Sequence, residues 1–451
     1  MRTCLLALVS CVIGLAWLVL YGSATKAADA PPQGVEVLTR GPVHEAFAQV
    51  ADVNPAPTPV IPRQPPNAIE ELPPDQQPQG DNIQWIPGYW AWDQDQSDFV
   101  WVSGIWRAPP PDRQWLPGHW QQVAGGWQWV QGLWMPLGQT QVPIVPPPPP
   151  PLNAAPSTPA PDATSTYVPG CWVYQDTRYL WRPGFWIADQ PGWVWIPAHY
   201  FWTPSGCIFV EGFWDYPVET RGLLFAPVRI DRRLLTQVNW RFQPHFVVRA
   251  ENLLATLFVG PAGRHYYFGD YFGPAYQKRG YVFWMDRRID RHSPDPLFSY
   301  YRHRPDGERW ERNIRDLHAA WHTGQGPLPP RTLTQQNQVL QNYRREPAVN
   351  KTVINNMTVV HPLPRVESPA VKLGAVTKEQ QMQAHQSTEW YRQVQQQRQA
   401  HEAQFVGKGP TPVERSAAVR TLQVPQAPHP ARVAVKAPPP PTLPKHVEKP
   451  H

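Results

Sequence analysis

The sequence predicts a mainly β protein, with antiparallel meanders of Trp-rich repeats, a small α+β segment and long disordered Pro/Gln-rich regions. The first observation is that 23 of the 451 residues are tryptophan, an excess that disordered chains, which are poor in aromatic residues, do not show. The second is that 59 residues are proline, which is excluded from helix interiors and central strands. The third is that 17 of the tryptophans lie between residues 81 and 215. Folded aromatic blocks must therefore alternate with proline-rich connections.

Eight copies of one short motif account for this concentration of tryptophan. Each copy is six residues long. Its first and last residues are aromatic, and its fourth residue is usually glycine. The starts of the first four copies are 16, 14 and 14 residues apart, and those of the second four are all 14 apart. The seventh copy departs from the pattern, with Ala198 in place of glycine and Tyr200 in place of tryptophan. The copies span residues 85–90, 101–106, 115–120, 129–134, 167–172, 181–186, 195–200 and 209–214.

The local pattern of each unit indicates a β-strand. Aromatic residues alternate with others, as in Trp127-Gln128-Trp129, and alternation with aromatic enrichment is typical of strands. Turn-forming residues such as Gly125 and Gly126 connect the units. The glycine inside each motif then marks a β-bulge or a close approach of two backbones. The alternative is a hairpin turn at each Pro-Gly, but that pair favours a type II turn, which splays hairpin strands. We therefore favour the bulge.

The pattern of apolar residues predicts a helix from Asp306 to His322, with Asp306 as N-cap and Gly324 as the stop.

Composition divides the chain into seven parts. The parts are a signal peptide (1–27), a Pro-rich linker (28–80), repeat block 1 (81–135), a second Pro-rich linker (136–166), repeat block 2 (167–215), an Arg-rich α+β domain (216–332) and a mostly disordered Gln/Asn/Pro-rich tail (333–451) with a helix at 377–405.

The N-terminus has the pattern of a secretory signal peptide. An apolar run extends from Leu5 to Tyr21, and small residues follow up to Ala27, where cleavage is expected. The alternative is an uncleaved signal anchor, since the run is near the lower limit for spanning a bilayer. We expect an exported protein of the periplasm, cell envelope or extracellular space. An uncleaved anchor is the only membrane attachment that the sequence suggests.

Two cysteines, Cys171 and Cys207, remain after removal of the signal peptide. An even count in an oxidising compartment favours a disulfide. Geometry opposes it, because the first and last strands of a flat four-stranded meander lie about 14 Å apart, whereas a disulfide needs Cα atoms within about 7 Å. The sequence leaves both outcomes open.

Charge is unevenly distributed. Residues 81–215 carry a net charge of −6, residues 216–345 carry +9 and residues 406–451 carry +5. Proteins that bind single-stranded nucleic acid combine aromatic residues and positive charge in one groove. Here they lie on different segments, so we expect no nucleic-acid partner. The basic segments could meet an anionic wall polymer or lipid headgroups, dock on the acidic repeats, or simply be solvated.

The eight units resemble the tandem WxxGxW repeat family, also written as the YXWGXW type, of bacterial cell-envelope proteins. The resemblance covers residues 81–215, about a third of the chain. It implies an architecture and a compartment, but no reaction. Residues 216–345 resemble the domain that accompanies such repeats in longer envelope proteins.

No pattern in the sequence points to a catalytic, cofactor or metal site. His318 and His322 share a face of the predicted helix but lack a third ligand and a zinc motif. Asp93, Asp95 and Asp98 lie in one polar turn, where solvation is the simpler interpretation than a glycosidase pair. We therefore expect that the protein is not an enzyme and binds no cofactor and no metal. The alternative is an unrecognised enzyme in residues 216–332.

The motif tryptophans have two interpretations. They form the core of thin sheets, since each indole buries about 150–250 Å², or they form a core and also expose a binding face. On the second interpretation the function is a structural or interaction platform for an envelope component such as a wall polymer, glycan or protein. The alternative is a polysaccharide- or peptidoglycan-binding module. The candidate aromatic surface comprises Trp85, Trp90, Trp101, Trp106, Trp115, Trp120, Trp129, Trp134, Trp172, Trp181, Trp186, Trp195 and Trp214.

Overall fold

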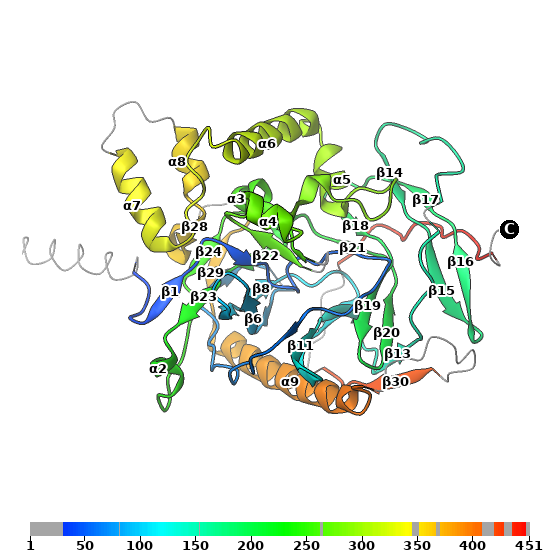
Figure 1. Ribbon diagram of the computed structural model, residues 1–451, viewed down its shortest axis with the longest axis horizontal. Coiled ribbons are helices and arrows are strands. Elements are labelled where there is room, and N and C mark those ends of the chain that lie inside the picture. The colour runs from blue at the N-terminus through cyan, green and yellow to red at the C-terminus, as the bar shows by residue number, and fades with distance from the viewer. Residues whose placement is uncertain are drawn as a thin grey trace, which may run out of the picture.

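The computed structural model describes residues 30–80, 82–152, 154–261, 265–344, 351–366, 370–407, 419–427 and 435–447. The signal peptide expected at residues 1–27 lies outside the described residues. Short antiparallel strands of repeat block 2 (167–215) extend to one end of the molecule, and those of repeat block 1 (81–135) lie in its middle (Figure 1). The long helix α9 (Lys378–Ala403) lies along one side of them, and helices α6 (Gly307–His322) to α8 (Lys351–Met357) lie on the opposite side (Figure 1).

The eight repeat units form four hairpins, each built from two consecutive units. The strand of each unit is interrupted at its Pro-Gly position, so a hairpin contains four short strands in two antiparallel pairs. The first hairpin comprises β5 (Gln84–Ile86), β6 (Tyr89–Asp93), β7 (Asp98–Val102) and β8 (Ile105–Arg107); the second β9 (Arg113–Leu116), β10 (His119–Val123), β11 (Gly126–Val130) and β12 (Leu133–Pro136); the third β14 (Ser165–Val168), β15 (Cys171–Gln175), β16 (Arg178–Arg182) and β17 (Phe185–Ala188); the fourth β18 (Val194–Ile196), β19 (His199–Thr203), β20 (Gly206–Val210) and β21 (Phe213–Asp215).

The interruption in each strand is neither a bulge nor a turn. In the first hairpin Trp85 faces Trp106 and Trp90 faces Trp101, so the register continues unchanged across the gap. A bulge would add one residue to one strand, and a turn at Pro-Gly would pair the two tryptophans of the same unit. Both interpretations are therefore wrong. The expected meander is also wrong, since the two hairpins within a block do not pair with each other.

The close approach expected at the motif glycines is confirmed, and both an aromatic ring and the backbone of the facing strand take part in it. A Cβ on Gly132 would lie 2.4 Å from Cζ2 of Trp115 and 2.8 Å from the amide nitrogen of Gly118 on the facing strand. The other motif glycines, Gly88, Gly104, Gly118, Gly170, Gly184 and Gly212, meet the first aromatic residue of the partner unit in the same way. The positive-φ residues of the described chain do not include these seven glycines. The motif therefore needs glycine for space rather than for backbone freedom.

Ala198 fits this constraint because its partner unit begins with a smaller ring. The fourth hairpin pairs Trp195 with Trp214 and Tyr200 with Phe209. Ala198 and Phe209 pack in one small apolar cluster, whereas Gly212 of the same hairpin lies against Trp195. Phenylalanine leaves room for the methyl group that an indole would exclude.

Loop length explains the single spacing of 16 residues. In the first hairpin Asp93 pairs with Asp98, which leaves four residues in the loop. In the second hairpin Val123 pairs with Gly126, which leaves two. The third and fourth hairpins also have two-residue loops.

The segment expected to be a Pro-rich linker, residues 28–80, is packed against the repeats. Its strands are β1 (Val35–Val37), β2 (Gly41–Pro42), β3 (Val60–Ile61) and β4 (Gln76–Pro78), and they pair with strands of the Arg-rich region, of repeat block 1 and of the tail. β3 extends the second hairpin by pairing with β11. The linker between the blocks also contributes a strand, β13 (Gln141–Ile144), which pairs with β30 (Arg420–Gln423) of the tail. One hydrophobic cluster includes residues from Val35 to Val424.

The Arg-rich region is a small mixed α+β structure, as expected. Helix α6 confirms the amphipathic helix expected over residues 306–322, and Gly324 follows it with φ of 72°. The other elements of the region are β22 (Gly222–Leu224), β23 (Val228–Ile230), α2 (Arg232–Leu235), β24 (Phe246–Val248), α3 (Ala250–Ala255), β25 (Leu257–Val259), β26 (Tyr266–Phe268), α4 (Pro274–Lys278), β27 (Val282–Phe283) and α5 (Pro296–Arg302), with 3₁₀ turns at Val218–Thr220 and Trp284–Asp286.

The expectation of long disordered regions is wrong for the described parts of the tail. They contain α7 (Leu333–Arg344), α8, β28 (Val360–Pro362), a 3₁₀ turn at Leu363–Arg365, β29 (Leu373–Ala375), α9 and β30. Helix α9 confirms the helix expected at 377–405, and Thr377 and Gln380 form its capping box. Its buried residues include Trp390, Tyr391 and Val394. None of the helices within the described residues is long and apolar enough to cross a bilayer.

Buried charge joins the acidic repeats to the basic region. Asp215 binds Arg107 at 2.6 Å and Arg221 at 3.0 Å, and all three side chains are buried. The two guanidinium groups also donate to main-chain oxygens of Ala46 and Phe47. This cluster therefore ties both repeat blocks and the N-terminal segment together.

We predict that Gly132→Ala destabilises the protein by about 2 kcal/mol or more, because the added methyl group overpacks the Trp115 indole and the facing backbone. Gly326→Ala is the matched control, since its Cβ would meet nothing within 4 Å. Urea denaturation followed by tryptophan fluorescence measures both.

Adding Trp115→Phe to Gly132→Ala recreates the natural pairing of Ala198 with Phe209. The double variant should lose less stability than the sum of the two single losses. Strictly additive stability losses would show that the indole of Trp115 is not the reason why position 132 must be glycine.

Candidate functional site

The interruptions in the strands leave backbone groups that no neighbouring strand satisfies. Buried polar groups must find partners elsewhere. In the first hairpin the carboxylate of Glu71 accepts the amide N–H of Gly88 at 2.7 Å, the amide N–H of Gly104 at 2.9 Å and the indole N–H of Trp101 at 3.0 Å. His44 Nε2 lies 3.1 Å from the carbonyl oxygen of Pro87.

The second hairpin uses another carboxylate in the same way. Glu45 accepts the amide N–H of Gly132 and the indole N–H of Trp129, both at 2.9 Å. The carbonyl groups at this interruption are satisfied from helix α9. Gln395 donates to the oxygen of Gly118 at 2.6 Å, and Arg398 donates to those of Pro117 and Gln131 at 2.8 and 2.9 Å. A Gln-rich helix therefore packs here through its polar side chains.

Burial shifts the titration of these groups. Burial raises the pKa of Glu71 to about 7, although Trp101, Gly104 and Gly88 oppose the rise as donors. The pKa of Glu45 is also raised to about 7 by burial, against its hydrogen bonds from Gly132 and Trp129. Perturbed carboxyl groups often mark active sites. Here the oxygens are already engaged by the hairpins, so both residues hold the fold together.

Most of the expected aromatic surface lies in the core. Ten of its thirteen tryptophans are buried, and the half-buried ones are Trp120, Trp186 and Trp195. Facing indoles pack edge to face within the hairpins, with centroids 5.0–5.3 Å apart for Trp85–Trp106, Trp90–Trp101, Trp115–Trp134, Trp172–Trp181 and Trp195–Trp214. The motif positions are therefore first of all structural.

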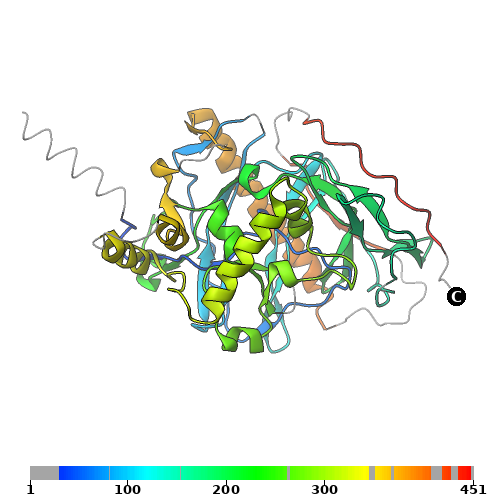
Figure 2. The ribbon, with the colours of Figure 1, turned by 90° about the horizontal axis from the view of Figure 1, so that it is seen from above.

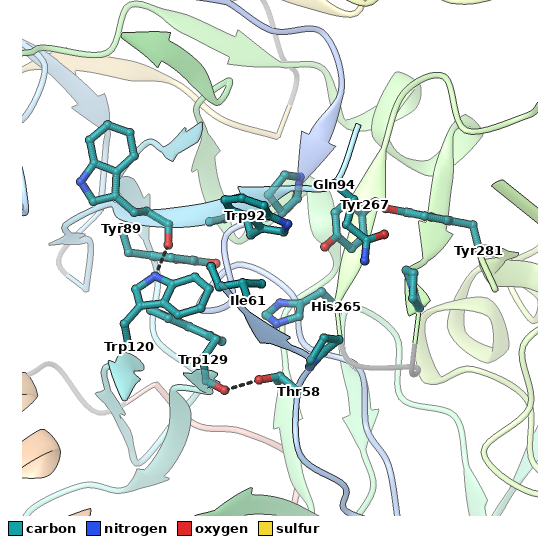
Figure 3. Close-up of a pocket in the computed structure, with 15 residues that line it drawn as sticks. Thr58, Ile61, Tyr89, Trp92, Gln94, Trp120, Trp129, His265, Tyr267 and Tyr281 are labelled. Carbon is teal, nitrogen blue, oxygen red and sulfur yellow. Dashed lines mark hydrogen bonds between the residues drawn. The ribbon is translucent and has the colours of Figure 1, made fainter. Parts of the chain in front are cut away.

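One aromatic pocket opens beside the first and second hairpins (Figure 3). Its volume is about 100 Å³. Tyr89, Trp92 and Trp120 line it from the repeats, while Tyr267 and Tyr281 line it from the Arg-rich region. Small-molecule sites of proteins usually enclose about 300–1,000 Å³. The pocket therefore suits part of a ring or one unit of a longer ligand.

Hydrogen bonds and ring contacts fix the walls of the pocket. Tyr89 stacks on Trp129 with centroids 4.8 Å apart. The indole N–H of Trp120 donates to the oxygen of Trp90 at 2.9 Å, and Thr58 Oγ donates to that of Trp129 at 2.6 Å.

Polar side chains accompany the aromatic walls. Gln94 and His265 also line the pocket, and His265 Nδ1 lies 3.4 Å from Glu45 Oε1. The pocket thus combines aromatic faces with a few polar groups, which is the usual composition of a binding site.

Sequence reasoning missed most of these pocket residues, among them Trp92, Tyr267 and Tyr281, and it missed both carboxylates. Trp92 lies outside the motif, and Tyr267 and Tyr281 come from a region without repeats. Glu45 and Glu71 lie in the segment interpreted as linker. A signal was present in the sequence, since Glu45 is an isolated carboxylate within the apolar stretch from Val43 to Val50.

The histidine pair and the two cysteines lie outside the pocket. Within the described residues no group of three or more His, Cys, Asp or Glu side chains is placed to hold a metal ion. His318 stacks on Phe283 with centroids 3.9 Å apart. Cys171 and Cys207 are both buried and free, and they belong to the third and fourth hairpins respectively.

Comparison with known proteins identifies the repeats. The WXXGXW repeat family, whose description specifies two copies of the repeat, matches residues 85–107, 115–135, 166–186 and 191–215. Residues 85–215 therefore contain WXXGXW repeats, and each match covers one of the four hairpins. No curated protein and no solved structure matched the chain.

Glu71→Gln should change how stability depends on pH. The pKa of Glu71 is about 7 in the folded state and 4.5 ordinarily. Its contribution to the free energy of unfolding is therefore full below about pH 4.5 and is lost as the pH rises to about 7. The stability of the natural chain relative to the variant should fall over this range by up to about 3 kcal/mol.

Urea titrations at several pH values test this, with the exposed Glu379→Gln variant as the control for loss of one carboxyl group. A difference between the natural chain and Glu71→Gln that is constant from pH 4.5 to 7 would contradict it.

We predict that the two cysteines are free thiols in the folded protein. A chain lacking residues 1–27, denatured without reductant, should show two thiols. In the native state both should react slowly, because burial raises the pKa of the Cys207 thiol to about 12 and also raises that of Cys171. Zero thiols in the denatured monomer would show the disulfide that the compartment favours.

Proposed function

We propose that this WXXGXW repeat protein is an exported, non-enzymatic protein of the cell envelope whose hairpins form an interaction platform, and that the pocket in Figure 3 is its point of contact with a glycan. The apolar run near the N-terminus supports export. The observation that carries the proposal is the aromatic pocket, in which aromatic residues of the repeats lie together with the polar side chains of Gln94 and His265.

The chemistry of the pocket suits a sugar ring. The C–H bonds on one face of a pyranose carry partial positive charge, which the negative face of an aromatic ring attracts. Trp92 and Trp120 are half-buried, so part of each indole remains accessible. Gln94 and His265 also line the pocket, and their side chains can form hydrogen bonds with sugar hydroxyl groups.

The size of the pocket favours a polymer over a free small ligand. A volume of about 100 Å³ cannot enclose a whole drug-sized molecule. It can hold one unit of a chain that continues over the surface. A wall glycan is therefore a better candidate than a soluble metabolite.

Trp92→Leu should weaken glycan binding about tenfold, since an aromatic stacking contact contributes about 1 kcal/mol or more. Titration of soluble wall fragments and oligosaccharides into the full chain, followed by intrinsic fluorescence, gives the midpoint for each variant. Trp202→Leu is the control, because Trp202 is half-buried in the fourth hairpin, outside the pocket.

The absence of a saturable shift across the panel would remove the glycan from the proposal. Equal weakening by Trp92→Leu and Trp202→Leu would show that the pocket is not the site.

A further inference from the structure

The two tryptophans of the repeat motif use their indole N–H groups differently. The first tryptophan donates to a buried carboxylate in two units, Trp101 to Glu71 and Trp129 to Glu45. The second tryptophan donates to main-chain oxygens of proline-rich parts of the chain in four units. These bonds are Trp90 to Asn67 at 2.9 Å, Trp172 to Pro150 at 2.9 Å, Trp186 to Thr158 at 3.0 Å and Trp214 to Pro439 at 3.4 Å.

This arrangement matches how proteins recognise polyproline II segments. A polyproline II helix has no internal hydrogen bonds, so its carbonyl groups are available to outside donors. Aromatic grooves bind such segments at a low entropy cost, because the segment is already extended. An indole supplies both an apolar ring and one N–H donor.

The C-terminal segment 435–447 shows such docking on the third and fourth hairpins. It contains four consecutive prolines, Pro438 to Pro441. Figure 2 shows this red segment running beside the strands of these hairpins. Ala437 packs against the apolar cluster around Trp214. At the other end, Val447 and Trp181 exchange two main-chain hydrogen bonds of 3.0 and 2.8 Å.

Several apolar side chains of residues 435–447 remain exposed. Val435, Leu443 and Val447 remain 36%, 42% and 41% exposed, which is high for apolar residues in a docked strand. Its two lysines, Lys436 and Lys445, give it a net charge of +2, whereas residues 165–215, which form the third and fourth hairpins, carry −2. Attraction between opposite charges therefore adds to a contact with little buried area.

We propose that this face of the third and fourth hairpins is a binding surface for a lysine-flanked polyproline II segment of another protein, and that residues 435–447 are its resident intramolecular competitor. The surface is distinct from the pocket of the first and second hairpins. The partner segment takes the place of residues 435–447, with its carbonyl groups toward Trp214 and its end paired with the backbone of Trp181.

The test uses a fluorescent peptide with the sequence of residues 435–447 as the probe. Its anisotropy is measured against the full chain and against a chain ending at residue 434. The shortened chain should bind it at least about tenfold more tightly, because a tethered competitor acts at an effective concentration in the millimolar range. A peptide with glycine at positions 438–441 should not bind.

Two single substitutions in the shortened chain separate the surface from general folding effects. Trp214→Phe keeps the ring and removes the N–H donor, so binding should weaken about fivefold. Trp186→Phe removes an indole N–H that serves Thr158 instead, and should leave binding unchanged. Thermal melts establish that both variants are folded.

Three results would overturn the proposal. The first is no binding of the peptide by the shortened chain at millimolar concentration. The second is equal binding of the glycine-substituted peptide. The third is self-association of the full chain that disappears in the shortened one, since that would identify a second copy as the occupant.

Discussion

In all four hairpins an aromatic side chain of one strand fills the space that a side chain on the facing strand would need. The contact of Trp115 with Gly132 is typical, with 2.4 Å between the indole Cζ2 and the position of a Cβ. The constraint explains the glycine, the facing pairs of indoles and the interruption of every strand. It also explains Ala198, whose partner unit begins with Phe209 rather than tryptophan.

The interruptions make the hairpins dependent on the rest of the chain. In the first and second hairpins they leave backbone groups that need partners, and Glu45, Glu71 and Arg398 supply them from outside the repeats. Within the described residues, segments rich in proline or glutamine therefore pack against the hairpins, although their composition alone would not form a core. The same chemistry gives the platform its proposed contacts, because indole N–H groups that do not meet a carboxylate are available to carbonyl groups of extended chains.

The sequence predicted the repeats, their strands, helix α6 and helix α9, because periodicity and capping residues are local properties. It could not predict how units pair, since a bulge, a turn and an indole over glycine all require glycine at the same position. It also could not assign Glu71 to the repeats, because only the folded chain brings it to Gly88 and Gly104. The pocket was missed for the same reason, since Tyr281 joins Trp92 only through the fold.

The most direct measurement of the central contact is proton NMR of the full chain with labelled glycine and tryptophan. The structure predicts nuclear Overhauser contacts between the Hα protons of Gly132 and Hζ2 of Trp115, and between those of Gly118 and Hζ2 of Trp129. Each contact joins a glycine to the first tryptophan of the partner unit. Contacts of each glycine only with tryptophans of its own unit would contradict the account, because they would place a turn at every Pro-Gly.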